Sequence, residues 1–196
     1  ITIFSNQAVF TYDDMEITLL DTPGHVDFSA EMERTLQVLD YAILVINGMD
    51  GVQSHTDTLW KLLKRYEIPT FIFVNKMDMD GADKDAVFQN IRKKLDGDCV
   101  DFSSEDRDEQ IAMADERLLD TYLDSGTVET EDIIEAILDR KIFPCFWGSA
   151  LKLSGVQELL DAMNTYMVMP AYNAEFGGRI FKISRDAKGE RLTYMK

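Results

Sequence analysis

The chain has 196 residues, of which 45% are hydrophobic, and a formal net charge of −16 at pH 7. This length and composition predict one sizeable hydrophobic core and little more than one domain. They argue against a membrane protein, because no apolar run approaches the roughly 20 residues that cross a bilayer. Cys99 and Cys145 form no C-x-x-C pair, which favours two reduced thiols in a cytoplasmic setting.

The negative charge is concentrated in one region of the sequence. Residues 80–140 contain 19 acidic and seven basic side chains, a balance of −12. An evenly acidic surface would repel the phosphates of nucleic acid. Because the rest of the chain is close to neutral, binding to the ribosome stays open, whereas we expect no direct DNA binding. We interpret the acidic region as the solvated faces of helices.

The chain opens with the pattern of a hairpin followed by a helix. Residues 3–10 and 16–20 are predicted to form two strands joined by an Asp-Asp turn. Ser29 can cap the helix that follows. The apolar stripe of that helix consists of Met32, Leu36 and Leu39.

Two buried strands follow, separated by a turn and a helix. Residues 41–46 and 71–74 are apolar runs, and between them lie a turn at 47–51 and a helix over about 52–66. The residues of this helix predicted to point inward are Leu59, Leu62 and Leu63. Strands that alternate with helices predict an α/β fold with a mostly parallel sheet. His55 belongs to no motif and is interpreted as a surface histidine.

The second half of the chain contains a helical region and a final hairpin. Residues 83–140 show only helical periodicity. A strand at 142–147 and a helix at about 154–167 follow. After Pro170, residues 177–195 are predicted to form a β-hairpin with a turn at 186–189.

The first motif with chemical meaning is Asp21-Thr22-Pro23-Gly24-His25, which follows the strand at 16–20. An acid, a Pro-Gly turn and a helix start after a buried strand are the layout that parallel α/β sheets use for binding sites. Asp21 is a candidate magnesium ligand, and Gly24 can bring its N–H close to a phosphate. His25 adds a titratable group. Alone, the motif also fits an ordinary turn.

The second motif is Asn75-Lys76-Met77-Asp78, which follows the strand at 71–74. The carboxylate of Asp78 can accept hydrogen bonds from both the N1–H and the exocyclic amine of guanine, a pattern that adenine does not offer. Lys76 can lay its methylene groups over the base. Asn75 can tie neighbouring loops together.

The third motif is Gly148-Ser149-Ala150-Leu151, which follows the strand at 142–147. Small residues there let backbone N–H groups approach the guanine carbonyl. Alone, a Ser-Ala pair after a strand is more often a structural turn. Three strand-end motifs in this order make a specific signal.

On these motifs, the chain resembles the G domain of translational GTPases in the elongation factor G branch. Asp21-Thr22-Pro23-Gly24 matches the third motif of that family, residues 75–78 match its guanine-specificity motif, and residues 149–151 match its last motif. His25 is the mark of the translation subfamily. Residues 143–150 and the short insert look most similar to the tetracycline-resistance ribosomal protection proteins.

The resemblance implies a cytoplasmic enzyme that binds GTP or GDP with Mg²⁺ and acts on the ribosome. Thr2 and Asp21 would hold the metal, Gly24 would bind the γ-phosphate, and His25 would be catalytic. The residues implied for the guanine base are Asn75, Lys76, Asp78, Ser149, Ala150 and Leu151. The fold implied is a P-loop GTPase-like sheet with flanking helices.

The sequence 1–196 contains no G-x-x-x-x-G-K-[ST] loop. In this family that loop precedes switch I, and residues 1–3 resemble the end of switch I. We therefore expect a fragment that is inactive alone. Residues 1–170 would be an incomplete G domain with a helical insert at about 83–140, and residues 171–196 would begin a β-barrel domain. The alternatives are a relative of elongation factor G or of a release factor, and a non-catalytic interaction module that has lost nucleotide binding.

Overall fold

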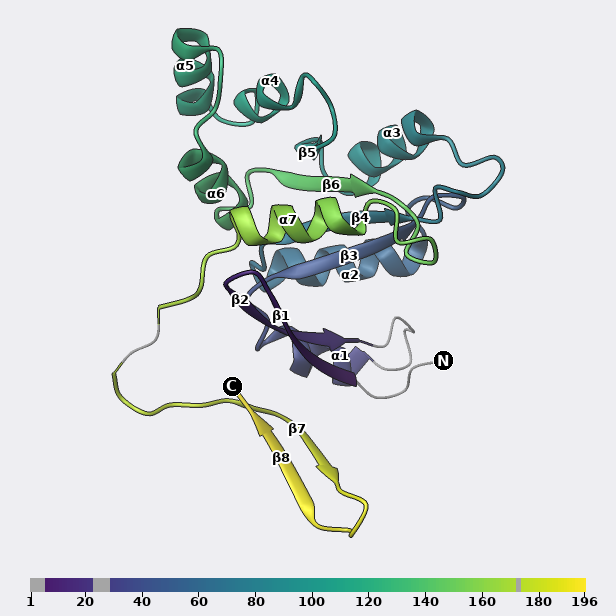
Figure 1. Cartoon of the computed structure of the whole chain (residues 1–196), viewed down its shortest axis with the longest axis vertical. Helices are drawn as coiled ribbons and strands as arrows, with labels where there is room; N and C mark the ends of the chain where they lie inside the picture. Colours follow the sequence, from purple (N-terminus) through teal and green to yellow (C-terminus); the bar gives the residue numbers. More distant parts are fainter. Residues whose placement is uncertain (1–5, 23–28, 172–173) are drawn as a thin grey trace. The chain divides into compact units, whose positions relative to one another are not determined.

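The computed structural model describes residues 6–22, 29–171 and 174–196 (Figure 1). The chain divides into two compact units. One comprises residues 41–168, and the other comprises residues 1–40 together with 169–196. One edge of this division lies close to the domain boundary predicted at residue 170, whereas the division at residue 40 has no counterpart among the predicted domains.

The unit of residues 41–168 is built on a four-stranded parallel sheet. Its strands are β3 (Ala42–Asn47), β4 (Thr70–Asn75), β6 (Phe143–Trp147) and β5 (Cys99–Asp101), in that spatial order. The central strand β4 is almost completely buried, as its run of aromatic and branched residues predicts. The predicted α/β fold with a parallel sheet is confirmed.

Helices cover both faces of this sheet (Figure 1). Successive residues of a strand point to opposite faces of the sheet. Phe143 and Phe146 of β6 are three residues apart and therefore lie on different faces. Trp60 contacts Phe143 edge-on at 4.7 Å, whereas Phe102 lies 5.6 Å from Phe146 and also from Tyr166. One face is therefore covered by α2 (Ser54–Arg65), which contains Trp60, and the other by α7 (Val156–Tyr166), which contains Tyr166.

The buried face of α2 differs from the predicted one. Thr56, Trp60 and Leu63 are its buried residues, whereas Leu59 and Leu62 are only partly buried. Spacings of four and three residues place these three side chains on one stripe. The prediction that Leu63 points inward is therefore confirmed, whereas Leu59 and Leu62 lie only partly within a buried face that also contains Trp60.

The region 83–140, predicted to be a helical insert, also contains a strand. Its helices are α3 (Lys84–Lys94), α4 (Arg107–Ala112), α5 (Glu116–Ser125) and α6 (Thr130–Leu138). Strand β5 lies between α3 and α4 and pairs with β6 in parallel, with Asp101 opposite Cys145. The prediction of helices alone was wrong, because three buried residues are too few to show a strand period.

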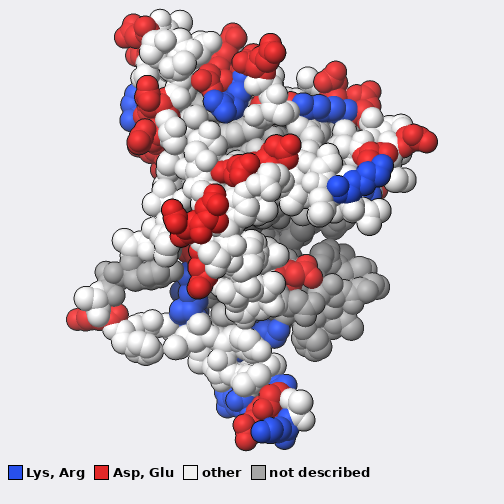
Figure 2. Space-filling model, in the orientation of Figure 1, with Lys and Arg blue, Asp and Glu red and all other residues white. Residues whose placement is uncertain are grey.

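The acidic side chains of this region gather on its surface. Figure 2 shows Asp and Glu over the area where Figure 1 places α4, α5 and α6. Acidic residues stand in the first turn of each helix, where the helix dipole favours them: Asp108, Glu109, Glu116, Glu131 and Asp132. Arg117 pairs with Glu135 at 2.8 Å. The interpretation as solvated helical faces fits this arrangement.

The unit of residues 1–40 and 169–196 contains two hairpins and a helix. Strands β1 (Asn6–Tyr12) and β2 (Met15–Asp21) are antiparallel, as are β7 (Ile180–Arg185) and β8 (Arg191–Met195). Both predicted hairpins are confirmed. Helix α1 (Ser29–Leu36) ends before Leu39, so that residue is not part of its stripe. The Nζ of Lys196 donates to the Val38 carbonyl at 2.9 Å.

Two further features concern the class of protein. Of the helices in the described ranges, none combines the length and the apolar character that crossing a membrane requires. Cys99 and Cys145 are both free and buried. Burial, and next the hydrogen bond with Cys99, raises the pKa of the Cys145 thiol well above its ordinary value. Both thiols are core residues, and the thiol of Cys145 is neutral.

Candidate functional site

The loops that follow β4 and β6 lie side by side at the carboxyl edge of the sheet. The backbone N–H of Gly148 donates to the Val74 carbonyl at 2.9 Å, and the N–H of Met77 donates to the Gly148 carbonyl at 3.0 Å. Two of the three predicted motifs, residues 75–78 and 148–151, are therefore brought together. This is the consequence of parallel strands that end at one edge.

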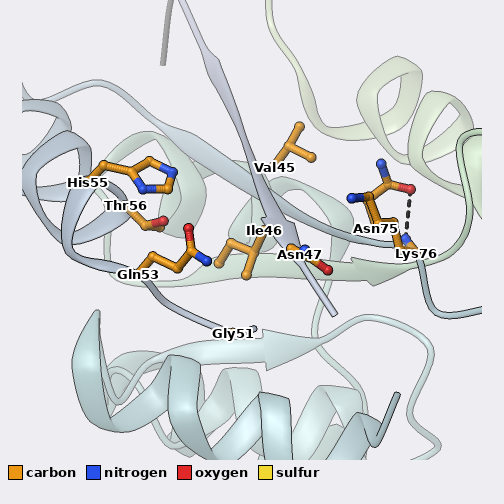
Figure 3. Close-up of a pocket in the computed structure, with 9 residues that line it drawn as sticks. All are labelled: Val45, Ile46, Asn47, Gly51, Gln53, His55, Thr56, Asn75 and Lys76. Carbon is orange, nitrogen blue, oxygen red and sulfur yellow. Dashed lines mark hydrogen bonds between the residues drawn. The ribbon is translucent and has the colours of Figure 1, made fainter. Parts of the chain in front are cut away.

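Asn75 links these loops to each other. Its Oδ1 accepts from the backbone N–H of Lys76 at 2.8 Å (Figure 3) and from that of Ala150 at 2.9 Å. Its carbonyl also accepts from the N–H of Gly48, in the loop after β3, at 2.8 Å. Asn75 thus contacts three strand-end loops, which is the tying role expected from the sequence. A guanine carbonyl would share the Ala150 N–H with Asn75.

Asp78 is held as a charged carboxylate beside the second loop. A hydrogen bond from the side chain of Ser149, and next the interaction with Lys152, lower its pKa below the ordinary value. The Nζ of Lys152 lies 3.1 Å from Oδ2 of Asp78. Ser149 itself is only 2% exposed, so its hydroxyl is fixed in place. The carboxylate is therefore ionised and oriented at neutral pH.

The order of these two causes predicts the effect of removing each partner. Both interactions stabilise the ionised form, so Ser149→Ala and Lys152→Ala should each raise the pKa of Asp78 toward its ordinary value, Ser149→Ala by more. An NMR titration of the Asp78 carboxyl carbon measures this directly. Lys93→Ala, a change of an exposed lysine on α3, is the control that should leave the pKa unchanged. A lower pKa in either test variant would contradict this arrangement.

Lys76 and Leu151 flank the pair of loops and are exposed. Lys76 has a φ of +67°, in the left-handed region, so the loop turns sharply at this residue. Leu151 is 92% exposed. Both side chains are thus free of the protein core.

The second loop is shaped by two glycines in tight contact. A Cβ on Gly148 would lie 2.1 Å from the Ser154 carbonyl oxygen, and a Cβ on Gly155 would lie 2.0 Å from the Trp147 carbonyl oxygen. Gly155 also has a φ of +73°. The loop therefore folds back on itself in a form that only glycine permits at these positions.

A hollow of about 180 Å³ opens beside the carboxyl edge of the sheet, at the ends of β3 and β4 (Figure 3). It is lined by Val45, Ile46, Asn47, Gly51, Gln53, His55, Thr56, Asn75 and Lys76. His55 is exposed, as expected, and lies with Gln53 and Thr56 on the opposite side from Lys76. Among the strands in the described ranges, β3 pairs only with β4. The hollow thus lies along the free edge of the sheet.

The remaining predicted residues belong to the other unit. Asp21 is the last residue of β2, is exposed and pairs in register with Asn6. Thr2, Gly24 and His25 lie outside the described residues. No group of three or more His, Cys, Asp or Glu side chains suited to a metal ion occurs in residues 6–22, 29–171 and 174–196.

Four side chains near the loops belong to none of the three motifs. Lys152 pairs with Asp78, and Trp147 donates from Nε1 to Oδ1 of Asp101 at 2.9 Å. Lys84 is paired with the same carboxylate. Trp147 and Lys152 directly flank the third motif, and this adjacency is the signal in the sequence that could have identified them. Nothing in the sequence pattern connects Asp101 with Trp147, 46 residues away.

Comparisons with known proteins agree with the motifs. The chain is 33% identical to the tetracycline resistance protein TetP of Clostridium perfringens and 34% identical to the oxytetracycline resistance protein of Streptomyces rimosus. Each alignment covers all of this chain and 34% of the relative, so the chain spans about a third of their length.

The fold has a counterpart among solved structures. A crystal structure of a protein from Thermus thermophilus matches the whole chain and 37% of its own, with a TM-score of 0.81 and 22% identity. Residues 1–169 match the family described as the elongation factor Tu GTP binding domain. The chain therefore belongs to the elongation factor Tu GTP binding domain family and is related to the tetracycline resistance proteins.

Proposed function

We propose that the gene product containing this chain binds guanine nucleotide and hydrolyses GTP on the ribosome, in the cytoplasm. The observation that supports this best is the paired loop: Asn75 bridges the segments 75–78 and 148–151, and Asp78 is ionised beside Ser149. A fixed carboxylate in the loop after a strand suits a base with two adjacent donors.

Asp78 would select guanine by accepting from its N1–H and its exocyclic amine. Adenine lacks this donor pair and would leave the carboxylate unpaired, which is costly where the partner is charged. Lys76 would cover one face of the ring with its methylene groups. The backbone of Ser149, Ala150 and Leu151 would lie against the guanine carbonyl.

The phosphate side of the site would involve Mg²⁺ bound by Thr2 and Asp21. Of these two, the described residues include Asp21, whose exposed carboxylate at the end of β2 is the hard oxygen ligand that this ion prefers. When bound, the ion would neutralise charge that develops on the phosphates. Gly24 N–H would hold the γ-phosphate, and His25 would position the attacking water.

Hydrolysis should depend on the ribosome and on more than residues 1–196. We expect no hydrolysis by this chain alone, because its sequence contains no G-x-x-x-x-G-K-[ST] loop to hold the α- and β-phosphates. Phosphate release by the gene product should rise about 100-fold or more when ribosomes are added, since activators of this kind supply transition-state stabilisation of that order. ATP in place of GTP is the control. A gene product that hydrolyses neither nucleotide with ribosomes present would contradict the proposal.

The finer proposal is that the gene product removes tetracycline from the ribosome, as the names of its relatives suggest. It should release labelled tetracycline from ribosomes in the presence of GTP. A relative of elongation factor G would instead promote movement of tRNA. The two assays on one preparation separate these activities.

A further inference from the structure

Trp147 is placed to act on the proposed base site. It is the last residue of β6 and directly precedes Gly148. Gly148 is hydrogen-bonded on both sides to the first loop, through Val74 and Met77. It also has no room for a Cβ, so the backbone cannot adjust there easily. A displacement of Trp147 would therefore be passed on to both loops.

The indole of Trp147 is held by Asp101, at the end of the neighbouring edge strand β5. Asp101 is 6% exposed. Its Oδ1 accepts from Trp147 Nε1 at 2.9 Å, from the Ser103 N–H at 3.0 Å and from the Ser103 hydroxyl at 2.7 Å. The carboxylate thus fixes the indole from a nearly buried position.

Lys84 and Phe88 of α3 complete the surroundings of the ring. The Nζ of Lys84 lies 2.6 Å from Oδ2 of Asp101 and 5.2 Å from the centre of the Trp147 ring. Phe88 meets the same ring edge-on, with centroids 5.8 Å apart. Since α3 begins shortly after Asp78, one cluster joins the end of the first loop to the start of the second.

The charge state of Asp101 favours this arrangement. Burial alone would raise its pKa, but hydrogen bonds from Lys84, Ser103 and Trp147 together outweigh burial and lower it. The group is therefore a carboxylate at neutral pH. It can accept from the indole and from the ammonium group at the same time.

We propose that Asp101, acting through Trp147, is a positioning residue for guanine recognition. The proposal rests on the proposed function and adds a determinant of base specificity that lies outside the three motifs. Asp101 does not touch the base. It sets the distance between the Asp78 carboxylate and the Ser149–Ala150 backbone, on which discrimination between bases depends.

The test is the discrimination between GDP and IDP, which lacks the exocyclic amine. Asp101→Asn in the gene product should lower the ratio of the two affinities about tenfold, because a residue in contact with Trp147 couples to the loop by about this much. Trp147→Phe keeps an aromatic side chain, loses the N–H donor and should lower the ratio likewise. Asp98→Asn, an exposed acid just before β5, is the matched control. A merely structural role would lower thermal stability and leave the ratio unchanged.

A second measurement keeps the outcome clear if Asp101→Asn does not fold. In protein labelled with 5-fluorotryptophan, the ¹⁹F resonance absent from Trp147→Phe should shift on GDP binding, and the Trp60 resonance should not. An unchanged ratio in both variants, or an unmoved Trp147 resonance, would overturn the inference while the proposed function stands. Failure of the wild-type protein to bind GDP would overturn both.

Discussion

Asp78→Asn in the gene product is expected to weaken GDP binding about 100-fold or more and to shift preference toward xanthine nucleotides. The carboxylate can accept two charge-assisted hydrogen bonds from guanine, whereas an amide offers one acceptor and places its NH₂ group against a guanine donor. Xanthine has a carbonyl where guanine has its amine, so the Asn side chain is complementary to it. Competition titrations with GDP and XDP measure both effects.

Asp80→Asn is the matched control for this substitution. Asp80 is an exposed acid two residues further along the chain, and the same change of charge there should leave both affinities as they are. An Asp78→Asn variant that keeps the GDP preference of the wild type would contradict the assignment of Asp78 to the base.

Gly148→Ala is expected to lower the free energy of unfolding by about 3 kcal/mol, the upper end of what overpacking costs. Its Cβ would lie 2.1 Å from the Ser154 carbonyl oxygen, and the nearest atoms are backbone atoms that cannot rotate away. The loop would have to open, which would also separate Ala150 from Asn75. Urea unfolding of residues 1–196 gives the loss of stability.

Gly97→Ala provides the comparison, because a Cβ there would meet nothing within 4 Å. Its effect should stay below about 1 kcal/mol in either direction. Equal stabilities for the two variants would show that the loop 148–155 is not packed as tightly as these contacts require.

The strands were predictable from the sequence where they are long enough to show a run of apolar residues or a regular alternation. Thr70–Asn75 is buried along nearly all of its length and therefore reads as one apolar run, and the two hairpins show turns between alternating residues. Cys99–Asp101 was missed because a three-residue strand has no period, and its acid looked like part of a solvated region. Its place at the sheet edge depends on pairing with β6, far away in the chain.

Helices were found, but their buried faces were predicted less well. In α2 the leucines suggested one stripe, yet Trp60 lies inward against Phe143 and turns the helix accordingly. Leu119 of α5 and Leu138 of α6 are apolar residues in helices with buried stripes, yet they are 38% and 42% exposed. Periodicity identifies a helix, whereas the choice among several apolar residues depends on the partner surface.

Part of the candidate site was predictable from the sequence and part was not. Asn75, Asp78 and Ser149 stand in local motifs, so their meeting at one edge of the sheet follows from parallel strands. The Asn75 link to Ala150 could be expected from that placement. The cluster of Asp101, Lys84 and Trp147 could not, because its members come from three separate elements and owe their contact to packing alone.

The central claim is that the loops 75–78 and 148–151 form a guanine site. The most direct measurement is a titration of the gene product with fluorescent GDP, GTP and ADP analogues, with residues 1–196 titrated in parallel. We expect saturable binding of both guanine nucleotides by the gene product and no binding of the adenine nucleotide. Equal binding of ADP, or no binding of any of the three, would contradict it.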